Sequence, residues 1–381
     1  MPAYVVVAVV AAVVTAVVTP LVGAFARRIG AIDVPADPRR VHREPVPTMG
    51  GLGMLAGVLA ALTAAALLPS FRELFTTSSE PLGILVGVLV IALVGVADDL
   101  RGLPPSIKLA GQMLAALGPV LFGVQLVYAW IPGLELVTLS ADLGVPLTVL
   151  AMLAMINAVN LIDGLDGLAA GVVAIAAIAF FAFVTVSGGA GIAESIPTSA
   201  PLVAAILVGV TTGFLLHNFH PARIFMGDTG AMMLGLLLAS AGISYVGRST
   251  APSYADFAGS VPLLIPGLVL AIPFVDTAFA VARRAYRRQS ITVADKGHLH
   301  HLLIAFGHSH RRAVMVLWYW SAVLAVATVM WSVLGPAELV AGVSTAILVG
   351  VLLTAAGVRR GHRESAVDDV LEATVRQAAG R

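Results

Sequence analysis

Aspartate residues stand in three short polar stretches of an otherwise apolar chain, and their positions point to a site that binds a cation together with phosphate groups. They are Asp98 and Asp99, then Asp163 and Asp166 in NAVNLIDGLDG (157–167), and Asp228 in FMGDTG (225–230). Carboxylate oxygens suit Mg²⁺, which usually takes one or two of them and completes its shell with substrate phosphates. The three stretches are candidate parts of one metal-assisted site if the fold brings them together.

Asp98 and Asp99 follow an apolar segment (81–97) that is predicted to be a helix. The carboxyl-terminal end of a helix carries a partial negative charge, which repels carboxylates. Adjacent residues on a helix point in different directions, so the two acids can meet different partners. A solvated start of a loop is the alternative interpretation, but two charges in an unfavourable place indicate that something cationic, such as a metal ion, lies nearby.

The stretch NAVNLIDGLDG spaces Asn157, Asn160 and Asp163 three residues apart, which keeps them near one face of a helix. Two amides at a membrane boundary cost free energy unless they find partners, which favours a polar site on this face. Asp166 has a simpler alternative, because Asp-Gly favours a turn and Asp166 could cap the following helix. Asp228 could likewise be an N-cap. Three helix ends that each carry an aspartate favour the metal site over three independent caps.

The longest polar loop (283–312) is also the most basic. Its arginines, beginning with Arg283, are predicted to lie at the membrane surface, where anchoring next to anionic lipid is the alternative to binding a substrate. His298, His300 and His301 in GHLHH could donate to phosphate oxygens or shuttle protons near neutral pH. Zinc binding is a further alternative for these histidines, but zinc sites usually need a closed set of four ligands.

The rest of the chain predicts the elements that position these residues. Of its 381 residues, 59% are hydrophobic and 11% are charged, whereas a water-soluble domain carries about 25% charged residues. The chain is therefore predicted to be an all-α integral membrane protein, a polytopic helix bundle. A span needs about 20 apolar residues, and eleven transmembrane helices are predicted at 3–24, 50–69, 81–97, 107–124, 145–161, 168–187, 200–217, 229–246, 261–282, 313–333 and 337–357.

Numbering the loops alternately separates the basic residues into two unequal sets. One set contains every arginine and lysine except Arg72 and Arg248, so the positive-inside rule places it and the C-terminus in the cytoplasm and the N-terminus outside. A single membrane domain (1–358) and a charged cytoplasmic tail (359–381) are predicted. The candidate site lies on the cytoplasmic face, in loops 25–49, 98–107, 157–167, 217–229 and 283–312.

Single segments give further expectations. The outer loop 128–144 contains ELVTLS and could form a small hairpin. Gly53 and Gly57 in GGLGMLAG are expected to let helices pack closely. Asp276 lies inside a predicted span and should have a partner in the bundle interior, because a carboxylate there costs about 2.5–3.5 kcal/mol on insertion scales.

Five motifs, in this order, resemble those of the polyprenyl-phosphate N-acetylhexosamine-1-phosphate transferases, the family containing WecA, TagO and MraY. They are PTMGG (47–51), the Asp-Asp pair followed by Lys108 and Gln112, NAVNLIDGLDGL, FMGDTG and HLHH. The resemblance covers nearly the whole membrane region. It implies transfer of a sugar 1-phosphate from a UDP-sugar to a polyprenyl phosphate in the inner leaflet, with release of UMP and formation of a lipid-linked pyrophosphate sugar.

The resemblance also implies roles for these residues. Asp98, Asp99, Asp163 and Asp228 would be the catalytic residues. Asp98 would deprotonate or orient the prenyl phosphate, Asp228 and Asp99 would ligate Mg²⁺, and Mn²⁺ could substitute for it. The nucleotide and metal pocket would contain Asn157, Asn160, Asp163 and Asp166, and the phosphates would be held by Lys108, Arg283, His298, His300 and His301. Attack by one phosphate on another needs charge neutralisation and alignment more than a strong base. Direct attack is therefore preferred to a covalent enzyme intermediate.

Within the family, the histidine motif separates two branches. MraY-like members carry three consecutive histidines followed by Phe-Glu, whereas this chain reads HLHHLL and continues into an eleventh predicted span. The resemblance favours the WecA/TagO-like branch, with UDP-N-acetylglucosamine as donor, undecaprenyl or decaprenyl phosphate as acceptor, and a product that starts a cell-envelope polysaccharide pathway. An MraY-like phospho-N-acetylmuramoyl-pentapeptide transferase is the alternative. The implied setting is the bacterial inner membrane and its lipids, with no nucleic-acid partner and a homodimer permitted.

A membrane transporter is the competing class of function. Transporters place polar residues near the bilayer midplane, often at broken helices in two related halves. The acids here gather at one surface, and the sequence contains no evident internal repeat. The CDP-alcohol phosphotransferases are a second alternative, but their Asp-Gly…Ala-Arg…Asp…Asp signature is absent.

Overall fold

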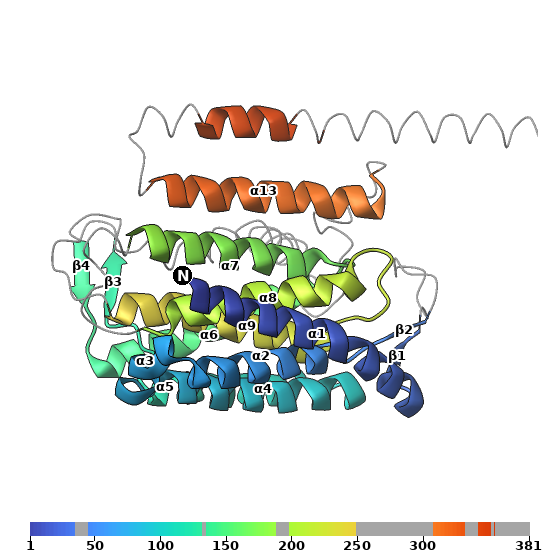
Figure 1. Ribbon diagram of the computed structural model, residues 1–381, viewed down its shortest axis with the longest axis horizontal. Helices are drawn as coiled ribbons and strands as arrows, with labels where there is room; N and C mark the ends of the chain where they lie inside the picture. The colour runs from blue at the N-terminus through green and yellow to red at the C-terminus, as the bar shows by residue number, and fades with distance from the viewer. Residues whose placement is uncertain are drawn as a thin grey trace, which may run out of the picture.

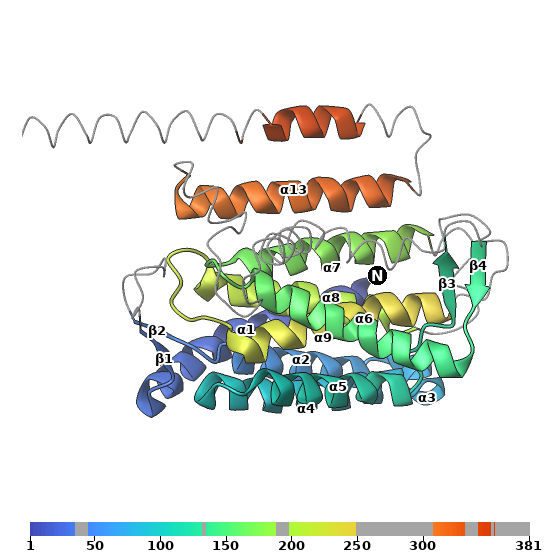
Figure 2. The same cartoon turned by 180° about the vertical axis from the view of Figure 1, so that it is seen from behind.

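The computed structural model describes residues 1–34, 45–131, 135–187, 198–248, 308–331, 342–351 and 354. Long helices run side by side along one common direction in this part of the chain (Figures 1 and 2), as predicted for a polytopic bundle. These long helices are α1 (Pro2–Ile29), α2 (Gly51–Leu67), α4 (Glu80–Arg101), α5 (Pro105–Leu121), α6 (Ala141–Ile162), α7 (Leu168–Ser187), α8 (Ala200–Asn218), α9 (Gly227–Arg248) and α13 (His310–Trp331). A 3-10 turn, η1 (Pro69–Phe71), and the short helix α3 (Arg72–Thr77) follow α2.

Helix α9 lies at the centre of the described bundle, in contact with α2, α4, α6 and α8. In its most apolar 18-residue window 94% of the residues are buried, against 28% for α1. Helix α1 exposes Val5, Val9, Val13 and Val17, as expected for a helix with one side in lipid. The first turn of α9, which carries Asp228, is therefore surrounded by the ends of other helices.

The number of spans agrees only in part with the prediction. Seven described helices are long and apolar enough to cross a membrane, or eight if Gly51–Leu67 and Pro69–Thr77, which meet at 89°, form one bent span. Leu68 has extended backbone angles, as expected for a residue that precedes proline. Helix α5 has 17 residues, and a shorter apolar helix lies at Gly342–Val351. Segment 261–282 lies outside the described residues, so the count of eleven and the two sides of the membrane stay predictions.

Two small antiparallel hairpins complete the described fold. Strand β3 (Tyr128–Ile131) pairs with β4 (Glu135–Thr138), which confirms the hairpin predicted in 128–144. Strands β1 (Ile32–Asp33) and β2 (Val46–Pro47) were not predicted. They connect the end of α1 to the start of α2 at the end of the bundle where the polar loops lie.

Gly53 and Gly57 bring α2 against α1, as predicted. A Cβ at Gly53 would overlap the hydroxyl of Thr19, and one at Gly57 would overlap the hydroxyl of Thr15. Small residues at helix crossings allow the close van der Waals packing on which membrane bundles depend.

Candidate active site

Two of the sequence motifs are joined through their main chains. Phe225 N donates to Pro47 O at 2.9 Å, and Gly50 N donates back to Phe225 O at 2.9 Å. Gly51 N donates to Met226 O, also at 2.9 Å. PTMGG and FMGDTG, which are far apart in the sequence, therefore lie side by side at the starts of α2 and α9.

Asp99, near the end of α4, caps the N-terminus of α9. Its Oδ1 accepts from Asp228 N at 2.7 Å, and its Oδ2 accepts from Thr229 N at 3.2 Å and from Thr229 Oγ1 at 2.6 Å. The first amides of a helix have no partner within the helix and carry a partial positive charge, so they stabilise a carboxylate. This contact explains how Asp99 tolerates the unfavourable end of α4, and it fixes the backbone that carries Asp228.

The alternative interpretation of Asp228, a cap on its own helix, is wrong. Helix α9 begins at Gly227, so Asp228 lies inside the first turn, and the cap comes from a residue 129 positions earlier in the chain. Because Asp99 takes the capping role, the carboxylate of Asp228 faces Lys108 of α5 instead.

Lys108 lies between two carboxylates. Its Nζ donates to Asp228 Oδ2 at 2.6 Å and to Asp98 Oδ2 at 2.8 Å, and the two carboxylates also approach each other within hydrogen-bonding distance. Asp98 Oδ1 accepts in addition from Leu103 N at 2.6 Å. The two adjacent acids thus meet different partners, as expected. The positive charge inferred beside them comes from Lys108 for Asp98 and from the N-terminus of α9 for Asp99.

Asn157 faces α5. Its Nδ2 donates to Gln112 Oε1 and to Leu153 O, both at 2.8 Å, and Gln112 Nε2 donates back to Asn157 Oδ1 at 3.3 Å. Such a pair satisfies polar side chains at a helix contact. Asn160 is partly buried three residues further along α6, towards Asp163. The nucleotide-binding roles of both asparagines stay predictions.

Asp163 follows the last residue of α6 and lies among other acids. Its side chain keeps part of its surface accessible, but the surrounding protein desolvates it. Desolvation, followed by the charges of Asp228, Asp99 and Asp166, raises the pKa of Asp163 to about 8. Four neighbouring carboxylates oppose one another's ionisation, and added positive charge relieves that repulsion. The region fits a divalent cation with oxygen ligands.

Asp166 does not cap α7. Its Oδ2 accepts from His220 Nδ1 at 2.6 Å, while its own backbone N donates to His310 Nε2 at 3.1 Å. The turn into α7 is held by Asn218, whose Oδ1 accepts from Gly167 N at 3.0 Å. His220 thus binds the carboxylate of Asp166, and Asn218 binds the turn before α7. A local cap by Asp166 would have joined this carboxylate to that turn.

His220 and His310 were not predicted to belong to the site. His220 stands in the loop 217–229, beside a proline in HNFHPAR, so the presence of an ionisable residue in a candidate loop could have identified it. His310 stands near the end of the basic loop 283–312, in HSHRR, and nothing local distinguishes it from His308. The two imidazoles stack with their centroids 4.2 Å apart and their planes at 17°.

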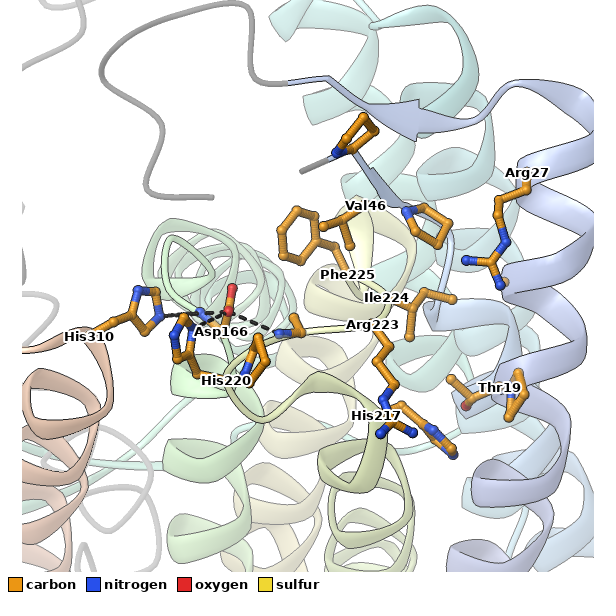
Figure 3. A pocket seen from close by; sticks show the side chains of 16 residues that line it. Thr19, Arg27, Val46, Asp166, His217, His220, Arg223, Ile224, Phe225 and His310 are labelled. Atoms are coloured by element: carbon orange, nitrogen blue, oxygen red, sulfur yellow. Dashed lines mark hydrogen bonds and ion pairs between the residues drawn. The ribbon is translucent and has the colours of Figure 1, made fainter. Parts of the chain in front are cut away.

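A cavity of about 890 Å³ lies beside these groups. Figure 3 shows two sets of side chains around it: Asp166, His220 and His310 on one side, and Arg27, Arg223 and His217 on the other. Phe225 also lines it, three residues before Asp228. Ligand pockets of roughly 300–1,000 Å³ enclose small molecules, so the cavity has room for much of a nucleotide.

Four predicted site residues lie outside the described part of the chain: Arg283, His298, His300 and His301. Asp276 and the tail 359–381 also lie outside it, and the roles given to all of them stay predictions. The described chain resumes at His308 and enters α13 at His310, which lines the cavity. The end of the loop 283–312 therefore reaches the candidate site.

Gly227 allows Asp99 to approach α9. Its φ is 66°, which L residues rarely adopt, and a Cβ would overlap the Asp99 carboxylate. Gly102 has a similar φ of 63° with open space around its Cβ position. We expect Gly102→Ala to cost about 1 kcal/mol of stability and Gly227→Ala about 1–3 kcal/mol more. Thermal unfolding in detergent measures the stability of both variants. Equal losses of stability would contradict the close contact between Gly227 and the Asp99 carboxylate.

Comparisons with known proteins identify the family. The model of glycosyl transferase family 4 matches residues 81–246. The decaprenyl-phosphate N-acetylglucosaminephosphotransferase of Mycobacterium tuberculosis (strain H37Rv) is 36% identical over 350 residues, 89% of this chain and 85% of the relative. The probable undecaprenyl-phosphate N-acetylglucosaminyl 1-phosphate transferase of Bacillus subtilis is 34% identical over 302 residues, 78% of this chain and 76% of the relative.

This membrane helix bundle, with acids and a lysine at one end, belongs to glycosyl transferase family 4. Its relatives in that family include polyprenyl-phosphate N-acetylglucosamine phosphotransferases, so the resemblance found in the motifs is confirmed. The phospho-N-acetylmuramoyl-pentapeptide-transferase of Desulforudis audaxviator is 33% identical over 310 residues, 76% of this chain and 85% of the relative.

Proposed function

We propose that this protein transfers N-acetylglucosamine 1-phosphate from UDP-N-acetylglucosamine to undecaprenyl or decaprenyl phosphate and releases UMP. The observation that carries the proposal is the placement of Lys108 between Asp98 and Asp228 at the N-terminus of α9. Phe225, three residues before Asp228, lines the cavity of nucleotide size. The names of the two transferases described above supply the substrate class.

Asp228 and Asp163 are the residues that we propose to hold Mg²⁺, or Mn²⁺ in its place. The fit rests on their chemistry, since both are carboxylates in a region where negative charges oppose one another. When bound, the ion supplies positive charge to the pyrophosphate of the donor. Asp99 was predicted to be a metal ligand and a catalytic residue, but both of its oxygens accept hydrogen bonds from α9. We therefore propose that Asp99 positions Asp228.

In the proposed step, an oxygen of the polyprenyl phosphate attacks the phosphorus that bears the sugar. A new phosphorus–oxygen bond forms, the bond to the bridging oxygen breaks, and its electron pair leaves on UMP. A phosphate monoester is already largely ionised at pH 7, so Asp98 is not needed as a strong base. Asp98 binds Lys108 and Leu103 N, and we propose that it orients Lys108, whose ammonium holds a phosphate oxygen.

The cytoplasm is the proposed location of the polar end of the bundle. Arg27, Arg28, Arg101, Arg223 and Arg311 all belong to segments at this end, which agrees with the positive-inside rule. The inner membrane follows as the location, because UDP-sugars are cytosolic donors. Arg283 and the histidines at 298, 300 and 301 are proposed to hold phosphates of the same substrates.

A purified sample with a panel of donors tests the proposal. With decaprenyl phosphate and Mg²⁺, UDP-N-acetylglucosamine should give UMP and a lipid-linked sugar, and EDTA should stop the reaction. UDP-N-acetylmuramoyl-pentapeptide should give no product. Turnover of the pentapeptide donor alone would favour the MraY-like alternative, and no turnover of any UDP-N-acetylhexosamine by a well-folded sample would refute the proposal.

Asp163→Asn should stabilise the metal-free protein. The folded-state pKa of Asp163, about 8, lies above the ordinary value of 3.8, so ionisation costs the folded state stability as the pH rises between these values. In EDTA the variant should unfold at a higher temperature than the wild type at pH 8, and the difference should shrink towards pH 5. Mg²⁺ should raise the unfolding temperature of the wild type more than that of the variant.

The control for this prediction is Asp142→Asn, which removes an exposed carboxylate from the first turn of α6. In EDTA it should unfold at the same temperature as the wild type at both pH 8 and pH 5, and Mg²⁺ should stabilise it as much as the wild type. A lower unfolding temperature for Asp163→Asn in EDTA at pH 8 would show that the carboxylates do not repel one another.

A further inference from the structure

We propose that His220 and His310 are positioning residues, whose stacked imidazoles fix the Asp166 turn so that it can bind the nucleotide part of the donor. The proposal rests on the proposed function for the identity of that donor. No role was predicted for either histidine. Both contact Asp166, whereas Lys108 contacts Asp98 and Asp228.

Each histidine binds a different part of Asp166. His220 Nδ1 donates to Oδ2 at 2.6 Å, and Ala222 N donates to the same oxygen at 3.0 Å. The backbone N of Asp166 donates to His310 Nε2 at 3.1 Å. One imidazole thus holds the carboxylate and the other holds the main chain, which fixes both the place of the residue and the direction of its side chain.

The contacts also define where the protons lie. His310 Nε2 accepts a hydrogen bond from a backbone N–H, so this nitrogen carries no proton. His220 Nδ1 donates to a carboxylate, so this nitrogen carries one. With Nε2 of His310 unprotonated, its imidazole is neutral, and a neutral ring can stack on His220 at 4.2 Å without the repulsion of two like charges. The stack is therefore compatible with both hydrogen bonds at once.

A metal site is the other interpretation of Asp166, His220 and His310, because one ligand atom from each lies within 4.8 Å of the others. We call the hydrogen-bonded arrangement of Asp166, His220 and His310 the clamp, and two observations favour it over a metal site. The rings are nearly parallel and stacked, at 17°, so their in-plane lone pairs do not converge on one ion. The Nε2 lone pair of His310 is already used by Asp166 N. The three side chains are therefore arranged for hydrogen bonding to one another.

The clamp faces the cavity. Asp166, His220 and His310 all line it (Figure 3). The described hydrogen bonds to the carboxylate of Asp166 end on Oδ2, which leaves Oδ1 available to a donor group of a ligand. Binding a ligand to this oxygen costs less conformational entropy when the Asp166 side chain is already held in place. Loss of the clamp should therefore weaken donor binding more than it slows the chemical step.

Position 310 offers a matched pair of variants. His310→Gln keeps an acceptor for Asp166 N, whereas His310→Leu has similar bulk without one. We expect His310→Leu to raise the KM for UDP-N-acetylglucosamine about 5- to 10-fold with kcat within about twofold, and His310→Gln to restore most of the loss. Met315→Leu, at an exposed position further along α13, is the control and should behave as the wild type.

Binding of UMP, measured by calorimetry, tests whether the effect passes through Asp166. In a double-mutant cycle, His310→Leu should weaken UMP binding in the wild type and have little further effect in Asp166→Ala. His220→Leu should behave in the same way. Additive losses would overturn the proposal, because they would mean that the histidines act on the ligand without Asp166. If wild-type protein binds UMP but transfers no sugar phosphate, the proposed function fails while the cycle still tests the clamp.

Hydrogen exchange gives a readout that does not depend on any ligand. The amide of Asp166 should exchange faster in His310→Leu than in the wild type, and His310→Gln should keep it slow. Equal exchange in all three proteins, or equal KM values for His310→Leu and the wild type, would overturn the proposal. A change in unfolding temperature shared by both position-310 variants, with no difference between them in KM, would also overturn it.

Discussion

Asp228→Asn is expected to lower the rate of sugar 1-phosphate transfer at least about 100-fold. The amide removes one negative charge from the proposed Mg²⁺ site and from the partner of Lys108, and losing one preorganised charged group at such a site usually costs 10²–10³ in rate. The cap on α9 is supplied by Asp99 rather than by Asp228, so the fold should survive the change. Initial rates of UMP release, measured over a range of Mg²⁺ concentrations, test this expectation.

The matched control for Asp228→Asn is Asp142→Asn, because both aspartates lie in the first turn of a helix. The control should retain full activity. If Asp228→Asn kept near-wild-type rates and an unchanged Mg²⁺ dependence, Asp228 would not hold the metal, and the proposed site would have to be centred on other residues.

Lys108→Gln should lower turnover by about 100-fold or more and, at the same time, strengthen the binding of the divalent cation. The ammonium of Lys108 lies 2.6 Å from Asp228 Oδ2 and 2.8 Å from Asp98 Oδ2, so it competes with an incoming cation for the same carboxylates. Removing a positive charge at this range makes the site more negative and favours a cation. We expect the dissociation constant of Mn²⁺, followed by electron paramagnetic resonance, to fall at least about threefold.

Lys108→Arg provides the charge-conserving control, although its planar group differs in shape from an ammonium. It should keep the Mn²⁺ affinity near that of the wild type. Unchanged Mn²⁺ binding in Lys108→Gln would contradict the competition, and weaker binding would indicate that Lys108 organises the carboxylates for the metal. Lost turnover with unchanged metal binding would restrict Lys108 to the substrate phosphates.

The convergence of the polar loops could be predicted from the sequence for a simple reason. Alternating apolar segments carry every second loop to the same side, and almost all arginines and lysines fall in that set. All five loops are described at least in part, and contacts such as Phe225 N with Pro47 O and Lys108 with Asp228 join segments at this end. Periodicity and charge distribution contain this information because both act over whole segments.

The assignment of each acid to a partner could not be predicted in the same way. Asp228 and Asp166 both occupy positions where a local cap is common, yet Asp99 caps α9 and Asn218 holds the turn into α7. These contacts depend on which helix ends meet in three dimensions. Local propensity says only that an aspartate near a helix start is favourable.

The positions of His220 and His310 in the site could not be predicted from the sequence either. His310 and Asp166 are 144 residues apart, and neither belongs to a local pattern that would associate them. The bend after α2 had a clearer signal, since Pro69 follows directly after Leu68 and proline disfavours a helical residue before it. The segment 50–69 was nevertheless predicted as one span, because it is apolar and long enough to cross the membrane.

The position of an isotopic label tests the proposed reaction most directly. UDP-N-acetylglucosamine, labelled with ³²P on the phosphate attached to the sugar, is incubated with the protein, decaprenyl phosphate and Mg²⁺. We predict that the label enters the lipid, that unlabelled UMP is released, and that Asp228→Asn abolishes both. Release of labelled UDP would mean that the sugar is transferred without its phosphate, and it would contradict the proposed function.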